Sequence, residues 1–192
     1  MLNYPNWLVF EKVLDEETCN RWLELGKSAP VQEAATFNSD DSHRKTDISW
    51  LPNEGEFQEI HDVLKAISLQ ANQHFKLTLT HLPPLQFTQY SDVGHHYDMH
   101  HDVNYNRQDG YHRKLSFVVQ LSDPEDYEGG LLSFSETESP DSEILLPKGT
   151  VICFLSYLQH GVSPITKGSR TSLVGWFEGP RFANNYLTVI IF

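Results

Sequence analysis

The residues best suited to chemistry are histidines gathered in one short stretch. Of the ten histidines, five lie between positions 95 and 112, in and after the sequence GHHYDMHHD. This stretch contains two His-x-Asp triplets, His96–Asp98 and His100–Asp102. Side chains two residues apart share a face of a strand, so either triplet could present one imidazole and one carboxylate to a metal. Positions 96, 98, 100 and 102 have the same parity, and the strand period therefore leaves both triplets open.

A third ligand is available in His160, which follows an apolar run and lies far along the chain from the cluster. Two imidazoles and one carboxylate, without cysteine, form the facial arrangement of non-haem Fe(II) oxygenases. The remaining coordination positions of the metal stay open in that arrangement. The residue types therefore favour an iron site with room for a cosubstrate and oxygen.

A longer pattern surrounds the second triplet. It reads Tyr, three residues, Gly, two residues, Tyr, two residues, His-x-Asp, and it is formed by Tyr90, Gly94, Tyr97, His100 and Asp102. In this pattern the sequence resembles the 2-oxoglutarate- and Fe(II)-dependent dioxygenases, and among them the prolyl 4-hydroxylase-like members of the bacterial and phage PKHD type. The resemblance covers about residues 85–180, including RKLSFVVQLSDPEDYEGG and PKGTVICFLSYLQHGVSPITKGSRTSLVGW. It selects the second triplet and implies His160 as the third metal ligand.

The resemblance also implies an activity and its cofactors. These are Fe(II), 2-oxoglutarate and O2, with ascorbate as a further one, in the hydroxylation of a prolyl residue in a protein or peptide with release of succinate and CO2. Arg170, ten residues after His160, would bind the far carboxylate of 2-oxoglutarate. A guanidinium suits that role because it stays charged and can donate two parallel hydrogen bonds to a carboxylate.

Further site residues are expected from the family positions and from strand periodicity. Ser172 shares a strand face with Arg170, and Gln120 stands where related enzymes carry a tyrosine that assists the anchor. Ser116, on the same face as Gln120, is expected to compensate for that tyrosine. The cosubstrate-binding set is therefore Arg170, Tyr90, Ser172, Ser116 and Gln120, and the substrate-contacting set is Arg44, Tyr97 and Trp176.

The other histidines are expected to have no metal-binding role. We expect His95, His96 and His101 at the rim of the pocket or in solvent, and His43, His61, His74 and His81 at the surface. His96 and Asp98 are the second choice for the metal.

These residues have to be positioned by strands. After Pro83 and Pro84, short β-like runs alternate with clusters of Gly, Pro, Asp and Ser. The runs are LQFTQY, LSFVVQL, LLSFS, EILL, TVICFL and RTSLVGWF. A polar stretch over residues 29–47 is expected to form a long loop, and YLTVIIF at the end of the sequence a last strand or a partner-binding edge.

Two helices are expected before the strands. The first runs from Glu16 to about Leu25, with Asp15 as its cap and Gly26 as its stop. The second runs over about residues 55–74, after the capping-box spacing of Asn53 and Glu56.

Two helices followed by many strands predict a mainly β fold with N-terminal helices, as a sandwich or barrel. The resemblance makes this a distorted double-stranded β-helix, a jelly roll or cupin-like barrel. We expect one dioxygenase domain over residues 1–192, with helical support over about 1–84, a catalytic β core over about 85–180 and a tail strand over 181–192.

The composition limits the class of protein. Fourteen Lys and Arg stand against 26 Asp and Glu, a net charge of −12, so binding along nucleic-acid backbones is disfavoured. The two cysteines lie far apart and support neither a disulfide framework nor a cysteine zinc site. The sequence shows no signal-like segment and no run of about 18 apolar residues, so we expect a cytoplasmic protein that does not bind membranes.

Three alternative functions stay open. A cupin-like metal-binding protein or isomerase is disfavoured because His160 lies eleven residues after Gly149, whereas cupins place this histidine close behind the glycine. An oxygenase of the same superfamily could act on a small molecule or on nucleic acid, but Trp176 stands where the nucleic-acid demethylases carry a second arginine. A non-catalytic binding module is disfavoured because all three predicted ligands are present.

Overall fold

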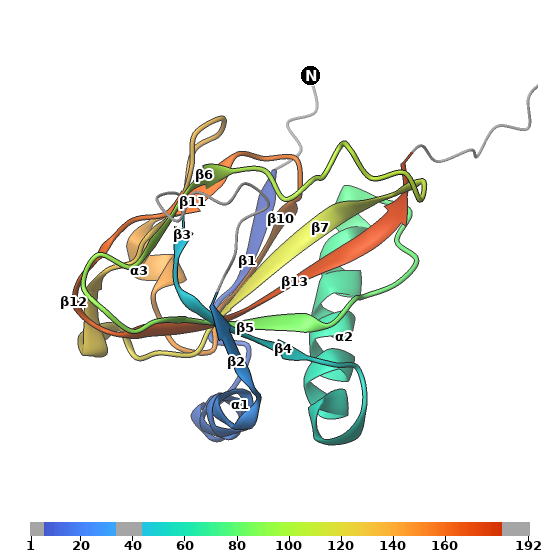
Figure 1. Ribbon diagram of the computed structural model, residues 1–192. Coiled ribbons are helices and arrows are strands. Elements are labelled where there is room, and N and C mark those ends of the chain that lie inside the picture. Colours follow the sequence, from blue (N-terminus) through green and yellow to red (C-terminus); the bar gives the residue numbers. More distant parts are fainter. Residues whose placement is uncertain (1–5, 34–43, 182–192) are drawn as a thin grey trace, which may run out of the picture.

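The computed structural model describes residues 6–33 and 44–181. Within them, two antiparallel sheets face each other and form a double-stranded β-helix (Figure 1). The major sheet contains, in spatial order, β1 (Trp7–Phe10), β10 (Val151–Leu155), β7 (Tyr111–Gln120), β13 (Arg170–Pro180), β5 (Leu85–Tyr90), β4 (Asp47–Leu51) and β2 (Val31–Glu33). The minor sheet contains β3 (Arg44–Lys45), β6 (His96–His100), β11 (His160–Val162) and β9 (Leu132–Phe134). A third, two-stranded sheet pairs β12 (Ile165–Gly168) with β8 (Tyr127–Gly129).

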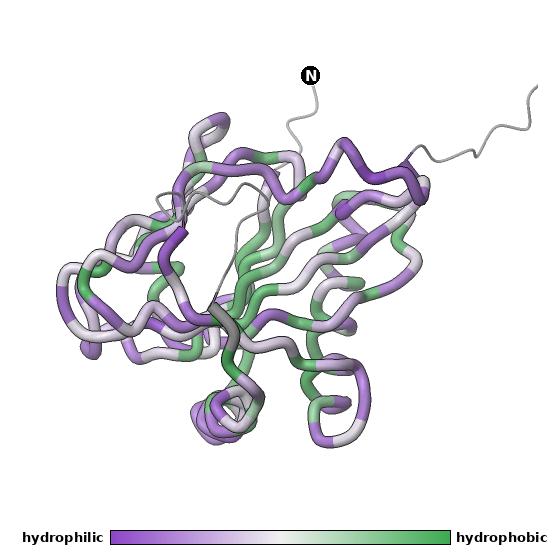
Figure 2. Tube along the Cα trace, in the orientation of Figure 1, coloured by the Kyte–Doolittle hydropathy of each residue, from purple (hydrophilic) through white to green (hydrophobic). Residues whose placement is uncertain are grey.

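Two helices cover the outer face of the major sheet. They are α1 (Glu16–Ser28) and α2 (Gln58–Phe75), and both lie on the side away from β6 and β11 (Figure 1). Their inward side chains, including Trp22 and Leu64, join a core with the outer face of the strands. The central strands are correspondingly the most apolar part of the trace (Figure 2). The helices therefore brace the sheet that carries much of the site.

Strand β7 shows how the sheet divides this core from the interior between the sheets. Leu115, Phe117 and Val119 are fully buried in the core under the helices. The alternate residues of a strand point to the opposite face. Val118 accordingly packs with the cluster of Phe134 and Phe154 between the two sheets. Ser116, Val118 and Gln120 of β7 thus face the interior, where chemistry can take place.

Gly26 lies inside α1 and does not end it. The helix continues to Ser28, and Gly26 is buried against the sheet. A Cβ atom at this position would lie 2.2 Å from Cδ2 of the fully buried Phe87 ring. The expectation that Gly26 stops the helix was therefore wrong, and its lack of a side chain serves packing.

We expect Gly26→Ala to lower the free energy of unfolding by about 1–3 kcal/mol, the usual effect of overpacking a core. Alanine favours helix over glycine by about 1 kcal/mol, but the overlap with Phe87 outweighs that gain. Urea unfolding measures the change, with the exposed Asn20→Ala in the same helix as the control. An unchanged or raised stability of Gly26→Ala would show that the Phe87 ring moves aside freely.

Several other local expectations were wrong. Helix α2 follows a 3-10 turn (Gly55–Phe57), and its N-cap Phe57 makes no side-chain capping bond, so the capping box is absent. The run EILL lies mostly in the short helix α3 (Ser142–Leu145), since an apolar run of this length is compatible with helix or strand. The polar stretch 29–47 contains β2, β3 and the start of β4, and β1 was not predicted. Residues 34–43 of that stretch, which include His43, and residues 182–192 of the predicted tail strand lie outside the described residues.

Two histidines expected near solvent are buried. His61 lies on the inner face of α2, where its Nε2 is 3.0 Å from the carbonyl oxygen of Leu51. His95, expected at the rim, is also buried, and its Nδ1 accepts a hydrogen bond from the backbone N–H of Ser91 at 3.2 Å. Both are held by local backbone contacts and are not available to a metal in the interior.

In the described part of the chain, no helix has both the length and the apolar character required to cross a membrane.

Candidate active site

The three predicted metal ligands lie together at one end of the interior. His100 ends β6 and His160 begins β11, and these two residues face each other across the paired strands. Nε2 of His100 lies 3.6 Å from Oδ1 of Asp102, and Nε2 of His160 lies 3.5 Å from Oδ2. Ligand atoms of the three residues all fall within 4.8 Å of one another, the one such group found in residues 6–33 and 44–181. The register of β6 and β11 thus brings together residues 60 positions apart in sequence.

The hydrogen bonds of the two histidines prepare both rings for a metal. Nδ1 of His100 lies 2.8 Å from the carbonyl oxygen of Asp98, and Nδ1 of His160 lies 2.9 Å from that of Leu158. A carbonyl oxygen only accepts, so each Nδ1 donates and each Nε2 keeps its lone pair for the shared centre.

The protonation states of the buried ligands also suit a cation. Burial lowers the pKa of His160, although the neighbouring Asp102 opposes this effect. Burial would raise the pKa of Asp102, but the two histidines beside it hold this pKa well below its usual range. Two imidazoles and one carboxylate are the donor set that fits Fe(II) with open positions.

Aromatic rings hold the ligand rings in place. Tyr97 stacks on His100 with 3.6 Å between ring centroids and an interplanar angle of 16°. Phe154 packs edge-on against His160 at 4.7 Å. Tyr97 was predicted to contact substrate, and the structure also gives it this supporting contact with a ligand.

The predicted cosubstrate anchor lies deeper in the interior. Arg170 is the first residue of β13, only 4% exposed, and its strand partner is Tyr90. Its Nε donates to Oε1 of Gln120 at 3.2 Å, and its guanidinium lies 5.4 Å from the centre of the Tyr90 ring. Ser172 is buried on the same strand, opposite Gln120. Tyr90, Gln120 and Ser172 are therefore all grouped near Arg170.

Tyr127 completes this group and was not predicted. The amide of Gln120 donates to the hydroxyl of Tyr127, which lies on β8. Burial raises the pKa of Tyr127, while its contact with Arg170 opposes the rise. A phenol is thus present beside the anchor although Gln120 replaces the tyrosine of related enzymes. The only local signal is that Tyr127 precedes Gly129 and Gly130, and a Cβ at Gly130 would lie 3.0 Å from Cδ of Arg170.

A cavity of about 190 Å³ opens beside Arg170. Its polar lining includes Arg170, Gln120 and Thr150, and Val118 and Ile152 contribute apolar wall. The opposite wall comes from β9 and the segment around α3. A cation in the lining of a mainly apolar cavity is suited to a small molecule with a terminal carboxylate.

Ser116 lies elsewhere than expected. Its Oγ donates to Oδ2 of Asp102 at 2.6 Å, so it contacts the metal-ligand group. Ser116 and Gln120 do share the inward face of β7, but they lie four residues apart along it. We expected Ser116 to assist the cosubstrate anchor. In the structure its hydroxyl instead contacts the carboxylate ligand Asp102.

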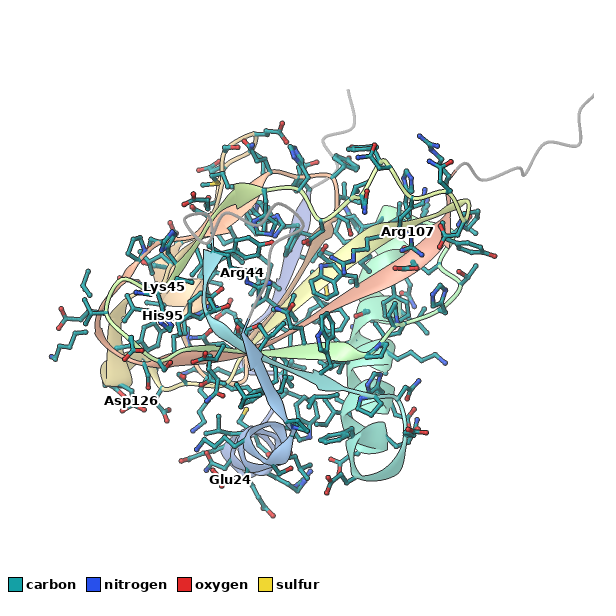
Figure 3. All side chains as sticks on the ribbon, viewed as in Figure 1. Glu24, Arg44, Lys45, His95, Arg107 and Asp126 are labelled. Carbon is teal, nitrogen blue, oxygen red and sulfur yellow. The ribbon has the colours of Figure 1, made fainter. Side chains whose placement is uncertain are left out.

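Two arginines and a tryptophan lie near the metal-ligand group. Arg44 lies on β3 (Figure 3) and is buried. Its guanidinium lies 4.6 Å from the centre of the Tyr97 ring. The guanidinium of Arg113, a residue the sequence analysis missed, lies 3.7 Å from the ring centre of Trp176. Burial lowers the pKa of Arg113, while the nearby carboxylates of Asp102 and Glu178 oppose this.

Two of these residues have buried donors without a partner among the described residues. They are Nη2 of Arg44 and Nε1 of Trp176. A buried donor normally finds an acceptor, and a bound molecule can supply one. Arg44 and Trp176 therefore stay candidates for substrate contact.

Known proteins match the part of the chain that contains most of these site residues. Residues 85–178 match the family model described as 2OG-Fe(II) oxygenase superfamily. A PKHD-type hydroxylase of Synechococcus sp. (strain CC9902) is 42% identical over 88 residues, which are 46% of this chain and 38% of that protein. The chain spans between 38% and 50% of the lengths of such curated relatives.

Solved structures match over nearly the whole chain. A prolyl-4-hydroxylase of Pseudomonas putida is 26% identical with a TM-score of 0.68, covering 90% of this chain and 91% of that one. A prolyl hydroxylase of Trichoplax adhaerens is 17% identical with a TM-score of 0.70, covering 90% and 83%, and it shows the shared fold. With its double-stranded β-helix, its His-Asp-His group and this match over residues 85–178, the chain belongs to the 2OG-Fe(II) oxygenase superfamily.

Proposed function

We propose that the chain is an Fe(II)- and 2-oxoglutarate-dependent oxygenase that hydroxylates a prolyl residue in a protein or peptide, with residues 1–192 acting as one domain. The observation that carries this proposal is the pairing of two features in one interior. The group of His100, Asp102 and His160 offers a facial donor set, and Arg170 offers a buried cation beside an apolar cavity. A cupin-like isomerase would leave Arg170 without a role.

Each of these residues would have its own role in binding. His100, Asp102 and His160 would hold Fe(II), which supplies the oxidative chemistry when it is bound. Arg170 would bind the far carboxylate of 2-oxoglutarate, with Gln120 orienting its guanidinium and Tyr127 placing a hydroxyl beside it. The apolar side chains of Val118 and Ile152 would exclude water from the cavity beside Arg170. In the overall reaction, 2-oxoglutarate and O2 give succinate and CO2, and one oxygen atom enters a C–H bond of the substrate.

The substrate would enter on the side of Tyr97, Trp176 and Arg113. Aromatic rings suit a prolyl ring, and an arginine whose guanidinium rests on an indole can donate to a peptide carbonyl. The structural relatives support this class of substrate, since one is a prolyl-4-hydroxylase and another holds a peptide fragment of hypoxia inducible factor.

Turnover with short prolyl peptides tests the proposal. Each peptide is incubated with Fe(II), 2-oxoglutarate, ascorbate and O2, and succinate and peptide mass are followed together. We expect one succinate per added oxygen atom, located on proline by fragmentation, and none with peptides in which alanine replaces proline. Succinate formed in step with oxidation of a free amino acid, and not of any prolyl peptide, would instead establish the small-molecule alternative.

We expect Tyr127→Phe to raise the KM for 2-oxoglutarate about 3- to 10-fold with kcat little changed. The lost hydroxyl removes one neutral hydrogen bond, about 0.5–1.5 kcal/mol, from the anchor group. Initial rates over a range of 2-oxoglutarate concentrations measure it. The exposed Tyr157→Phe is the matched control and should leave KM unchanged. An unaltered KM in Tyr127→Phe would remove Tyr127 from the cosubstrate site.

A further inference from the structure

Two buried serines form a chain of hydrogen bonds that ends at the metal-ligand group. Ser116 lies on β7, and Ser156 directly follows β10; both are fully buried. Their Oγ atoms are 2.8 Å apart, and Oγ of Ser116 is 2.6 Å from Oδ2 of Asp102. Buried hydroxyls in direct contact with a ligating carboxylate are well placed to orient it.

The chemistry of the three groups fixes the direction of this chain of hydrogen bonds. Oδ2 of Asp102 lies 2.6 Å from Oγ of Ser116, and a carboxylate oxygen accepts hydrogen bonds. Ser116 must therefore donate its single hydroxyl hydrogen to Asp102. Ser156 in turn has to donate to Ser116, because the hydrogen of Ser116 is already used. A donated bond of this kind makes the next hydroxyl a stronger donor.

Ser156 also holds the backbone around the site. Its carbonyl oxygen accepts from the backbone N–H of Asp102 at 3.1 Å, and its own N–H donates to the carbonyl of Lys114 at 3.0 Å. Four residues later the chain reaches His160 through a turn closed by Leu158 and Leu155. Ser156 thus contacts the segments that carry Asp102 and Ser116 and is close in sequence to His160.

We propose that Ser116 and Ser156 are positioning residues that set the orientation of the Asp102 carboxylate for metal binding. The bond from Ser116 to Oδ2 fixes the plane of the carboxylate, in which Oδ1 lies 3.6 Å from Nε2 of His100 and Oδ2 lies 3.5 Å from Nε2 of His160. Ser156 acts through Ser116 and through the backbone of Asp102. This inference rests on the proposed function, because it takes the His-Asp-His group to be a metal site.

Metal binding by the full chain tests the proposal without turnover. Co(II) serves as the probe because its visible absorption reports the geometry of its ligands, and Fe(II) is titrated in parallel without oxygen. We expect Ser116→Ala to weaken Co(II) binding about 10- to 100-fold, the usual effect of losing a contact to a metal ligand, and to alter the cobalt spectrum. We expect Ser156→Ala to weaken it less, because its backbone contacts stay. The double variant should bind about as weakly as Ser116→Ala, since one hydroxyl acts through the other.

The control is Ser68→Ala, which removes another fully buried serine hydroxyl on α2 and should leave affinity and spectrum unchanged. Circular dichroism and thermal unfolding of the metal-free variants verify their folds. Wild-type affinity together with a wild-type cobalt spectrum in Ser116→Ala would overturn the positioning role while leaving the metal site intact. Failure of the wild-type chain itself to bind Co(II) and Fe(II) would overturn the proposed function and this inference together.

Discussion

Replacing His100 or His160 by alanine is expected to abolish succinate formation and to weaken metal binding by more than about 100-fold. Loss of an outer contact to a ligand costs up to about 100-fold, and removal of the ligand itself should cost more. The fold should persist, because neither ring belongs to the core under the helices. Metal titration and a succinate assay measure both effects on the same preparations.

The matched control is His96→Ala, on the same strand as His100. The Nδ1 of His96 contacts the carbonyl of Gly94, and its Nε2 lies 3.5 Å from Asp98, away from the His-Asp-His group. We therefore expect His96→Ala to retain most activity and metal affinity. Full activity in His100→Ala, or a loss in His96→Ala as severe as in His160→Ala, would refute the assignment of the ligands.

Arg170→Ala is expected to raise the KM for 2-oxoglutarate about 30-fold or more. Truncation of one partner of a buried charged pair costs about 2–5 kcal/mol, and each 1.4 kcal/mol is tenfold in affinity. The effect should lie in KM, since Arg170 would bind the carboxylate farthest from the metal. Metal affinity in the absence of 2-oxoglutarate should be unchanged, which separates the anchor from the ligands.

Two further variants make the test of Arg170 sharper. Arg170→Lys keeps the positive charge but loses the two parallel donors of the guanidinium and the Nε bond to Gln120. We therefore expect a smaller rise in KM than in Arg170→Ala. Lys167→Ala removes an exposed cation from β12, paired with Glu128 at the surface, and should leave KM unchanged. A KM in Arg170→Ala close to that of the wild-type chain would mean that 2-oxoglutarate binds elsewhere.

The sequence was informative where reactive residue types occur at the spacing of a β-strand. Residue types and spacing left two His-x-Asp triplets open, and the family resemblance selected His100 and Asp102 with His160. The structure brings ligand atoms of these three residues within 4.8 Å of one another. The alternation of β7 also predicted that Ser116 and Gln120 share an inward face. The mainly β fold with N-terminal helices, a double-stranded β-helix, is confirmed by the sheets and by the solved relatives.

The sequence was least informative about contacts between segments that are distant in sequence and meet only when strands pair. Tyr127 reaches Arg170 because β8 pairs with β12, the strand just before β13, and no local pattern contains that contact. Arg113 lies among ordinary strand residues, and its position over Trp176 depends on the register of β7 with β13. Gly26 carries a helix-ending signal that tertiary packing against Phe87 overrides.

The central claim is that one interior binds Fe(II) through His100, Asp102 and His160 and 2-oxoglutarate through Arg170. Anaerobic addition of Fe(II) and 2-oxoglutarate tests it directly, because a 2-oxo acid chelated to Fe(II) gives a visible charge-transfer band. We predict that the band appears with the wild-type chain only when both are present, is absent in His160→Ala, and needs far more 2-oxoglutarate in Arg170→Ala. A wild-type chain that binds Fe(II) but shows no such band at saturating 2-oxoglutarate would contradict the account.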